Sequence, residues 1–248
     1  MSVSLRSLFS DPARPLGETD PEFVELFSRF AYDEVVHEPA ANHPDMDERI
    51  RSMVVLATLI GCQGIDAYRT MLPAALDAGV TPVEAKEIVY QATAYLGFGR
   101  VLPFLKATNE VLADCGVALP LEPQATVTAD TRMEEGERKQ IELIGEHMRG
   151  FADAGPEETR HIHRWLVGNC FGDYYTRKGL NGREREIVTL CYIAAQGGCE
   201  PQLTSHAKAN MHVGNDKAFL IAVISQAMPY IGYPRTLNAL ACIDKAAA

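Results

Sequence analysis

The sequence has 248 residues, of which 33 are Asp or Glu and 23 are Lys or Arg, so its formal net charge is -10. This acidic balance argues against a nucleic-acid partner, because nucleic acids attract basic patches. The longest apolar stretch, residues 53–60, is far shorter than the roughly 18 residues that span a bilayer, and the N-terminus has no apolar export signal. We therefore expect a soluble, cytoplasmic protein with no membrane partner and with reduced cysteines.

The first half of the chain follows an N-terminal arm, residues 1–20, and has the periodicity of helices. Apolar residues recur at spacings of three and four, and no alternating run is flanked by hairpin turns. One helix start is explicit, because Thr81 can cap, Pro82 suits the first helical position and Glu84 completes a capping box. The predicted helices cover residues 21–37, 47–60, 65–78, 82–96 and 100–115.

The second half begins after a linker, residues 118–132, which is rich in proline and threonine and lacks helical periodicity. It too is predicted to be helical. The expected helices cover residues 133–151, 156–175, 182–195, 200–212, 216–228 and 234–246.

The two halves are copies of one unit. A shift of 135 residues places QATAYLGFGR (91–100) on QAMPYIGYPR (226–235) and the apolar run 53–60 on 188–195. Identities that cluster in this way at one fixed offset indicate a tandem duplication. We therefore divide the chain into a first repeat over residues 21–117 and a second over residues 133–248.

Cys199, Gln202 and His206 have a spacing that places them on one face of a helix. Pro201 predicts that this helix starts near residue 200, which puts Cys199 at its N-terminus. The partial positive charge there favours a thiolate, and a neutral His206 could accept or deliver a proton. The alternative is structural, with Cys199 closing a Gly-Gly turn and His206 satisfied in the core.

The first repeat lacks these groups, because Gly64, Ala67 and Met71 occupy the three equivalent positions. We therefore expect any chemistry to be confined to the second repeat.

Charged residues at the start of the preceding helix could assist His206. Glu184 or Glu186 could orient the imidazole or relay protons, although acids also favour the first turn of a helix simply because of its dipole. Arg183 and Arg185 could meet a substrate carboxylate, and Gln202, on the helix of His206, is a further candidate for substrate binding.

The segment 226–235 adds Tyr230 and Arg235 as candidates for substrate binding. Because both repeats keep this pattern, a structural role is favoured: the glycine at position 232 breaks the helix, the aromatic residues pack, and Arg235 binds carbonyls or a carboxylate.

No cofactor or metal site is predicted. His161 and His163 would point to different faces of a helix, and no Cys/His cluster has zinc-ligand spacing. Phosphate-binding loops and dinucleotide fingerprints are absent from the sequence.

These segments together resemble the carboxymuconolactone decarboxylase family, which includes the alkylhydroperoxidase D-like (AhpD-like) proteins. In the second repeat the resemblance rests on FGDYYTRKGLNGREREIVTLCYIAAQGG, EPQLTSHAKANMHVG and QAMPYIGYPRTLNA. In the first it rests on ERIRSMVVLATLIG and AALDAGVTPVEAKEIVYQATAYLGFGR. The resemblance implies an all-α fold of two tandem AhpD-like helical repeats, packed around an antiparallel pair. It also implies a homo-oligomer, with a trimer of two-repeat chains as the expected form.

The resemblance implies two chemistries. The decarboxylase branch removes CO₂ from a small carboxylated lactone without a cofactor, and His206 matches its proton-transfer histidine. The peroxidase branch uses a CxxC motif: Cys199 matches the first cysteine, but Gln202 replaces the second. A thiol-dependent peroxidase would therefore need an external thiol reductant. The family's glutamate falls at Ile187, one residue beyond Glu186. A non-catalytic oligomeric binding protein is the third hypothesis.

Overall fold

The computed structural model describes residues 16–248, whose regular secondary structure is helical, with no strand in that range. Residues 1–15 of the predicted arm lie outside this range. The short helix α1 (Leu16–Thr19) belongs to the predicted N-terminal arm. The helices of the first repeat are α2 (Pro21–Arg29), α3 (Val35–His37), α4 (Glu48–Gly61), α5 (Ile65–Asp77), α6 (Pro82–Leu96) and α7 (Phe98–Asp114). Those of the second are α8 (Arg132–Ile144), α9 (Arg160–Trp165), α10 (Gly182–Gln196), α11 (Glu200–His212) and α12 (Lys217–Ala247). A π-helical segment, Phe30–Glu34, joins α2 to α3, and a second, Leu166–Tyr175, follows α9.

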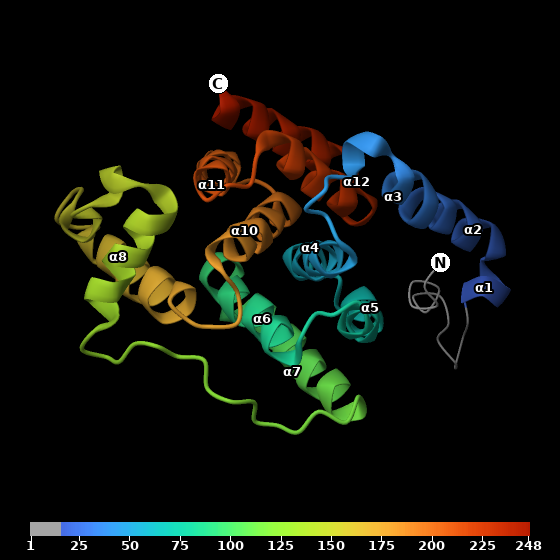
Figure 1. The fold of residues 1–248 in the computed structure, drawn as a ribbon, viewed down its shortest axis with the longest axis horizontal. Coiled ribbons are helices and arrows are strands. Elements are labelled where there is room, and N and C mark those ends of the chain that lie inside the picture. Colours follow the sequence, from blue (N-terminus) through green and yellow to red (C-terminus); the bar gives the residue numbers. More distant parts are fainter. Residues whose placement is uncertain (1–15) are drawn as a thin grey trace.

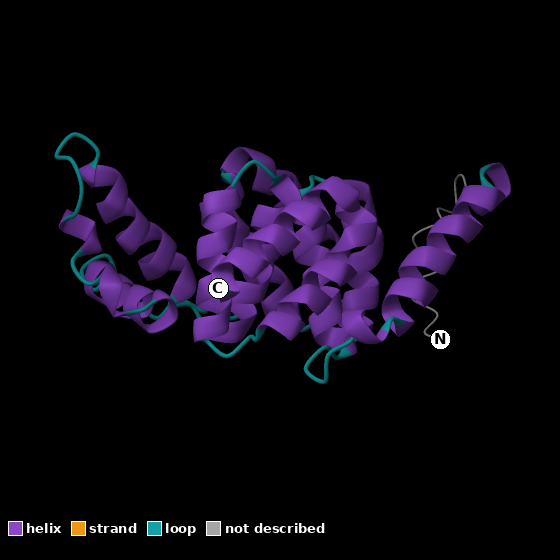
Figure 2. Cartoon of the chain, turned by 90° about the horizontal axis from the view of Figure 1, so that it is seen from above, coloured by secondary structure: helices purple, strands orange, loops and turns teal. Residues whose placement is uncertain are grey.

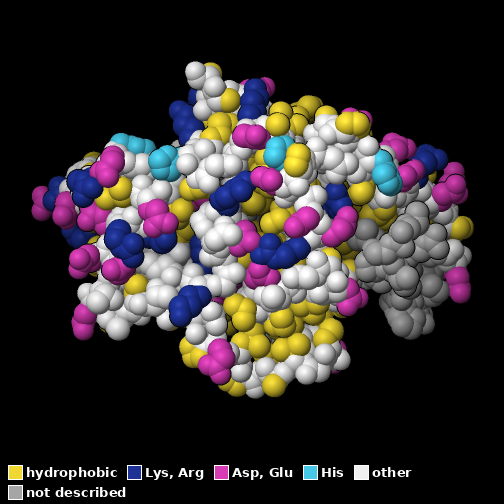
Figure 3. Space-filling view, in the orientation of Figure 1, with side chains coloured by type: hydrophobic (Ala, Val, Ile, Leu, Met, Phe, Trp, Pro, Cys, Tyr) yellow, Lys and Arg dark blue, Asp and Glu magenta, His cyan; other side chains and the backbone are white. Residues whose placement is uncertain are grey.

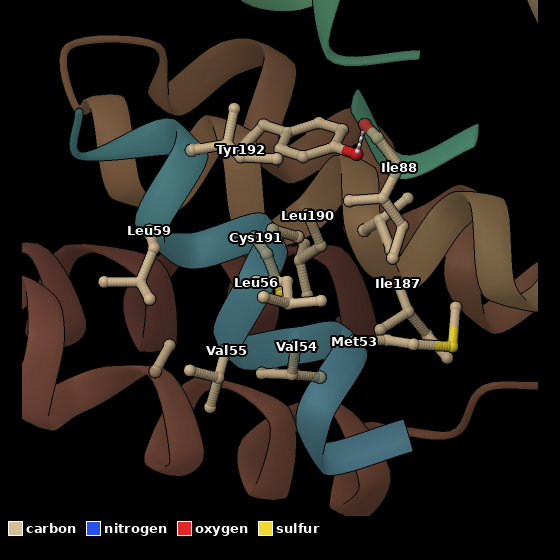
Figure 4. Close-up of a cluster of buried hydrophobic side chains, with 14 of the residues drawn as sticks. Met53, Val54, Val55, Leu56, Leu59, Ile88, Ile187, Leu190, Cys191 and Tyr192 are labelled. Atoms are coloured by element: carbon tan, nitrogen blue, oxygen red, sulfur yellow. Dashed lines mark hydrogen bonds between the residues drawn. The ribbon is translucent and has the colours of Figure 1, made fainter. Parts of the chain in front are cut away.

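Helices α4 and α10 form the centre of the molecule, with α11 and α12 on one side and α5, α6 and α7 on the other (Figure 1). Both central helices are buried almost all round: every residue of 184–195 is buried, as is every residue of 50–61 except Ser52. A helix that is apolar on all faces is typical of the interior of a helical protein. Figure 4 shows side chains of α4 and α10 meeting in this core, where the Tyr192 hydroxyl donates to the Ile88 carbonyl at 2.5 Å.

A glycine makes the close approach of the two central helices possible. A Cβ atom on Gly61 would lie 2.6 Å from the Cβ of Ala195 and 2.9 Å from the carbonyl oxygen of Tyr192. These distances are shorter than van der Waals contact, so no larger residue fits at this position without separating α4 from α10. The C-terminal end of α4 is thereby pinned against α10.

The two predicted repeats are visible as equivalent helices. The repeated segments 91–100 and 226–235 each contain a glycine that breaks the helix. These are Gly97 (φ 80°), between α6 and α7, and Gly232 (φ 75°), inside α12. Only glycine adopts this backbone conformation at little cost. Equivalent residues also meet across the centre, where Arg49 lies 2.5 Å from Glu184, 135 residues along the chain.

Two predicted helices end earlier or start later than expected. The helix predicted over 133–151 ends at Ile144, because Gly145 has φ 124° and short turns of 3-10 helix follow. The helix predicted from residue 156 begins at Arg160. The remaining bounds agree with the predictions to within two or three residues.

The prediction that the repeated aromatic residues pack was wrong for half of them. Tyr95 and Tyr230 pack against the core, but Phe98 and Tyr233, which follow the helix-breaking glycines, are 58% and 61% exposed. The glycine break turns the following residue outward, so the motif of each repeat presents one of its two aromatic side chains at the surface.

Two segments flank the central block on opposite sides (Figure 2). The helical arm 16–37 projects from one side, and α8 with the helix that ends at Tyr175 projects from the other. The extended linker runs along the edge of the block from α7 to α8 (Figure 1), where Gln124 accepts a hydrogen bond from the backbone of Lys178. No helix among residues 16–248 is both long and apolar enough to cross a membrane. Acidic and basic side chains are intermixed on the face drawn in Figure 3.

The contact at Gly61 predicts a specific loss of stability. Gly61→Ala should lower the free energy of unfolding by about 1–3 kcal/mol, because the added methyl group overpacks the crossing of α4 and α10. Urea denaturation measures this change. The matched control is Gly99→Ala in α7, where an added Cβ meets no atom within 4 Å and where alanine favours the helix. Equal stability of the two variants would contradict the role assigned to Gly61.

Candidate active site

His206 lies in the middle of α11 at the centre of a partly buried polar cluster. The helix begins after Cys199, with Pro201 in its first turn, where the missing N–H of proline costs no helical hydrogen bond. The His206 side chain is 13% exposed, and its Nδ1 lies 2.8 Å from Oε2 of Glu186 on α10. The structure therefore brings together the histidine and one of the two carboxylates that the sequence offered.

Glu186 is an unusual buried carboxylate. Its side chain is 0% exposed, and its Oε1 has no hydrogen-bond partner within residues 16–248. Desolvating a charged group costs several kcal/mol unless its lone pairs are satisfied, so native structures seldom leave such an atom open. Asn210 fixes the backbone around the pair by donating to the carbonyls of both Glu186 and His206. A buried carboxylate with one imidazole partner and one open oxygen is typical of a functional site.

The pairing determines which ring nitrogen of His206 is available. An ionised Glu186 can only accept, so Nδ1 of His206 carries the proton that it donates. In the neutral imidazole, Nε2 then carries the lone pair. This is the arrangement in which a carboxylate orients a histidine for proton transfer at the opposite nitrogen.

Tyr95 closes one side of the cluster. Its ring lies edge-on to the His206 ring, with centroids 5.4 Å apart. Its hydroxyl is 2.5 Å from that of Tyr175, which lies 2.8 Å from Oγ1 of Thr189. Burial raises the pKa of both tyrosines well above 10, and the nearby Glu186 adds to the rise. Both therefore remain neutral hydroxyls that can donate.

The sequence analysis missed Tyr95 and Tyr175 as site residues. Tyr95 belongs to α6 of the first repeat, so the first repeat contributes to a site that we had assigned to the second alone. The repeated Y-x-G motif marks Tyr95 as a residue present in both repeats, but it does not indicate which side chain Tyr95 contacts. Gln91, one turn earlier on α6, also contacts the second repeat. Its side-chain amide donates to the Thr189 hydroxyl and to the carbonyl of Arg185.

Cys199 is half-buried at the N-cap of α11 and is separate from the imidazole. Its sulfur accepts a hydrogen bond from the Gln196 amide at 3.4 Å. No hydrogen bond joins this sulfur to His206 within residues 16–248, and seven residues, a helical rise of about 10 Å, separate the two backbones. The shared helix face that the spacing predicts therefore does not make a thiol–imidazole pair. Gln202, between them, is exposed on α11.

Glu184 and Arg183 have partners other than His206. Glu184 is the third residue of a capping box with Asn181 and also pairs with Arg49. Arg183 donates to Asn215 at 2.9 Å and to Asp45 at 2.8 Å. These contacts stabilise the N-terminus of α10. A role for either residue in catalysis or substrate binding stays a prediction.

Arg185 faces the interior. It is 1% exposed and donates to the Gln91 side chain and to the Arg177 carbonyl, both at 2.7 Å, and its terminal nitrogen lies 3.2 Å from Glu87. Burial lowers the pKa of this guanidinium, and Glu87 opposes the effect. A substrate carboxylate would have to break these contacts to reach it.

Tyr230 and Arg235 lie apart from the cluster around His206. Tyr230 packs edge-on against Phe27, with ring centroids 6.2 Å apart, and lines a cavity of the first repeat. Arg235 is exposed, and its Nε would be 3.3 Å from a Cβ on Gly197 at the end of α10. Substrate binding by these two residues stays a prediction.

No group of three or more His, Cys, Asp or Glu side chains within residues 16–248 is arranged to hold a metal ion.

Comparison with known proteins identifies relatives of the chain. The model of the carboxymuconolactone decarboxylase family matches residues 21–110 and 161–245, one match in each repeat. The 4-carboxymuconolactone decarboxylase of Acinetobacter baylyi (strain ATCC 33305 / BD413 / ADP1) is 30% identical over 103 residues, which are 42% of this chain and 73% of that protein. A crystal structure from Burkholderia xenovorans LB400, provisionally named a gamma-carboxymuconolactone decarboxylase subunit, superposes with a TM-score of 0.56. It has 16% sequence identity and covers 99% of this chain and 96% of its own, so it supports the fold alone.

The buried Cys170 beside this cluster predicts a loss of stability at high pH. Burial raises the pKa of its thiol to about 12, whereas an unfolded cysteine titrates near 8.5. Between these values the unfolded chain releases a proton that the folded chain keeps, so the free energy of unfolding falls as pH rises, by up to about 1.4 kcal/mol per pH unit for each such group.

Urea denaturation at about pH 8 and about pH 10 measures this fall. Cys170→Ala should reduce it, whereas Cys115→Ala, which removes an exposed cysteine, should leave it as in the wild type. The same fall in all three proteins would show that Cys170 does not contribute.

Proposed function

Because the chain belongs to the carboxymuconolactone decarboxylase family, we propose that it is a cofactor-free enzyme that performs acid–base chemistry on a small carboxylated lactone or a related organic acid. His206 is the general acid/base, and the observation that carries the proposal is its 2.8 Å contact with the buried Glu186. In a decarboxylation the bond to the carboxylate breaks, CO₂ leaves, and the electron pair passes into the adjacent unsaturated system before a proton replaces it.

In the proposed mechanism each group has a role in that step. The protonated His206 delivers the Nε2 proton to the carbon that has lost CO₂, and a solvent proton then restores it. Glu186 stabilises the imidazolium and keeps Nδ1 protonated throughout. Tyr95 is a positioning residue, because its ring edge packs against the imidazole and its hydroxyl is held by Tyr175.

The carboxylate of the substrate needs a cation or a hydrogen-bond donor. Of the five candidates named from the sequence, Gln202 is exposed on the helix that carries His206, whereas Arg183 and Arg185 already have protein partners and Tyr230 and Arg235 lie apart from the cluster. We therefore favour Gln202 for this contact.

The two other hypotheses have weaker support. A peroxidase would need Cys199 activated by His206, but the sulfur has an amide as its partner and lies two helical turns away. A non-catalytic binding protein would have no use for the open oxygen of Glu186, whose burial costs stability.

Decarboxylation of 4-carboxymuconolactone by purified protein tests the proposal. His206→Ala should lower kcat by about 10²–10⁴-fold, the usual contribution of a general acid or base. Glu186→Gln, which keeps the shape but not the charge, should lower it by about 10–100-fold. Cys199→Ser is the matched control on the same helix and should retain activity, with no peroxide consumption in wild type or variant.

Unchanged turnover in His206→Ala would remove the histidine from the mechanism. Absence of turnover in the wild type would exclude this lactone as the substrate, and loss of a peroxide-consuming activity in Cys199→Ser would favour the peroxidase instead.

We also propose that the chain forms a homo-oligomer, with a trimer of two-repeat chains as the expected form. Large apolar side chains are exposed on both flanking segments: Phe23 is 61% exposed and Leu26 48% on α2, and Trp165 is 63% exposed on the opposite side. Light scattering of the purified protein distinguishes a monomer, a dimer and a trimer by mass.

A further inference from the structure

The first repeat contains a cavity of about 1120 Å³. It lies between the helical segment 16–37 and the helices α4 and α5, and α12 contributes Gln226 and Tyr230 to its lining. Its walls are mostly apolar, and Val55, Met71 and Ala75 contribute to them. This volume is slightly larger than the roughly 300–1,000 Å³ of most small-molecule sites.

The cavity is the counterpart of the His206 site. The offset of 135 residues places Met71 on His206, Arg51 on Glu186, and Tyr230 on Tyr95. Each repeat thus lends its motif tyrosine to the other's site, because Tyr230 lines the cavity and Tyr95 contacts His206. The acid–base pair of the second site is replaced here by a cation and a thioether, which cannot transfer protons at neutral pH but can bind.

The cavity holds buried donors that lack acceptors. Arg51 is 9% exposed; its two terminal nitrogens donate to Glu48 and Asn42, but its Nε has no partner in the described chain. The Tyr32 hydroxyl, although close to Tyr230, is buried and makes no hydrogen bond of normal geometry. Both groups line the cavity, and buried N–H and O–H groups without acceptors each cost about 1–3 kcal/mol.

We propose that this cavity binds a monocarboxylate with an apolar body, and that Arg51 holds the carboxylate. A carboxylate supplies two acceptors that match the open Nε–H of Arg51 and the hydroxyl of Tyr32, and charge-assisted hydrogen bonds of this kind are the strong ones. The apolar body of the ligand fills the space beside Met71 and Ala75. The inference does not depend on the proposed function, because no atom of the His206 cluster takes part.

Acidic side chains at the mouth narrow the class of ligand. Glu48 is 67% exposed and holds one nitrogen of Arg51. The cavity is also lined by three further acids and, outside Arg51, by one arginine and one histidine, so acids are in excess: Glu25, Asp33, Asp77, Arg29 and His37. A second carboxylate on the ligand would meet these acids at the mouth. A ligand with a single charged end, directed inward to Arg51, avoids this repulsion.

Isothermal titration with decanoate, and with decanol as the uncharged probe, tests the proposal. Wild-type protein should bind decanoate saturably. Arg51→Met should weaken decanoate binding by about tenfold or more while changing decanol binding little, because only the charged contact is lost. Arg51→Lys should restore part of the affinity and guards against a general effect on folding, which melting curves of both variants also report.

Filling the cavity provides the second arm of the test. Ala78→Trp, in the wall, should abolish binding, whereas Ala113→Trp, on the exposed surface of α7, should not. His206→Ala should bind decanoate as the wild type does. Absence of saturable binding, equal affinity of the wild type and Arg51→Met, no effect of Ala78→Trp, or loss of binding in His206→Ala would each overturn the proposal.

Discussion

The crossing of α4 and α10 at Gly61 is the contact on which the rest of the molecule depends. It brings two helices that are buried on nearly every face close enough for their backbones to touch, which a side chain at this position would prevent. With the centres of the repeats joined in this way, α6 of the first repeat lies beside α10 of the second. The site around His206 is therefore a product of how the repeats pack and does not belong to either repeat alone.

Duplication followed by divergence explains the difference between the two sites. The two sites share their packing. In each, the tyrosine of the Y-x-G motif comes from the opposite repeat, and the glycine of that motif breaks the helix two residues after the tyrosine. The chemistry is not shared, because the position that holds Glu186 in one repeat holds Arg51 in the other. One repeat thus keeps a histidine–carboxylate pair, while the other has an arginine facing an apolar cavity.

The sequence could predict those features that depend on local residue patterns. Helical periodicity and capping residues set the helices, and the fixed offset revealed the two repeats. It could not predict contacts that arise only when helices dock. Tyr95 reaches His206 from the other repeat, and nothing near it in sequence indicates this. Arg185 looked available at a helix start, but α10 is surrounded on all sides, so its guanidinium is buried in protein contacts.

The central claim is that Glu186 fixes His206 with the proton on Nδ1 and thereby prepares Nε2 for proton transfer. The most direct test is NMR of ¹⁵N-labelled histidine, which distinguishes protonated from unprotonated ring nitrogens. The neutral ring of His206 is expected as the Nδ1–H form in the wild type, and as a mixture of both forms in Glu186→Gln. A neutral ring with its proton on Nε2, or one whose state does not change in Glu186→Gln, would contradict the claim.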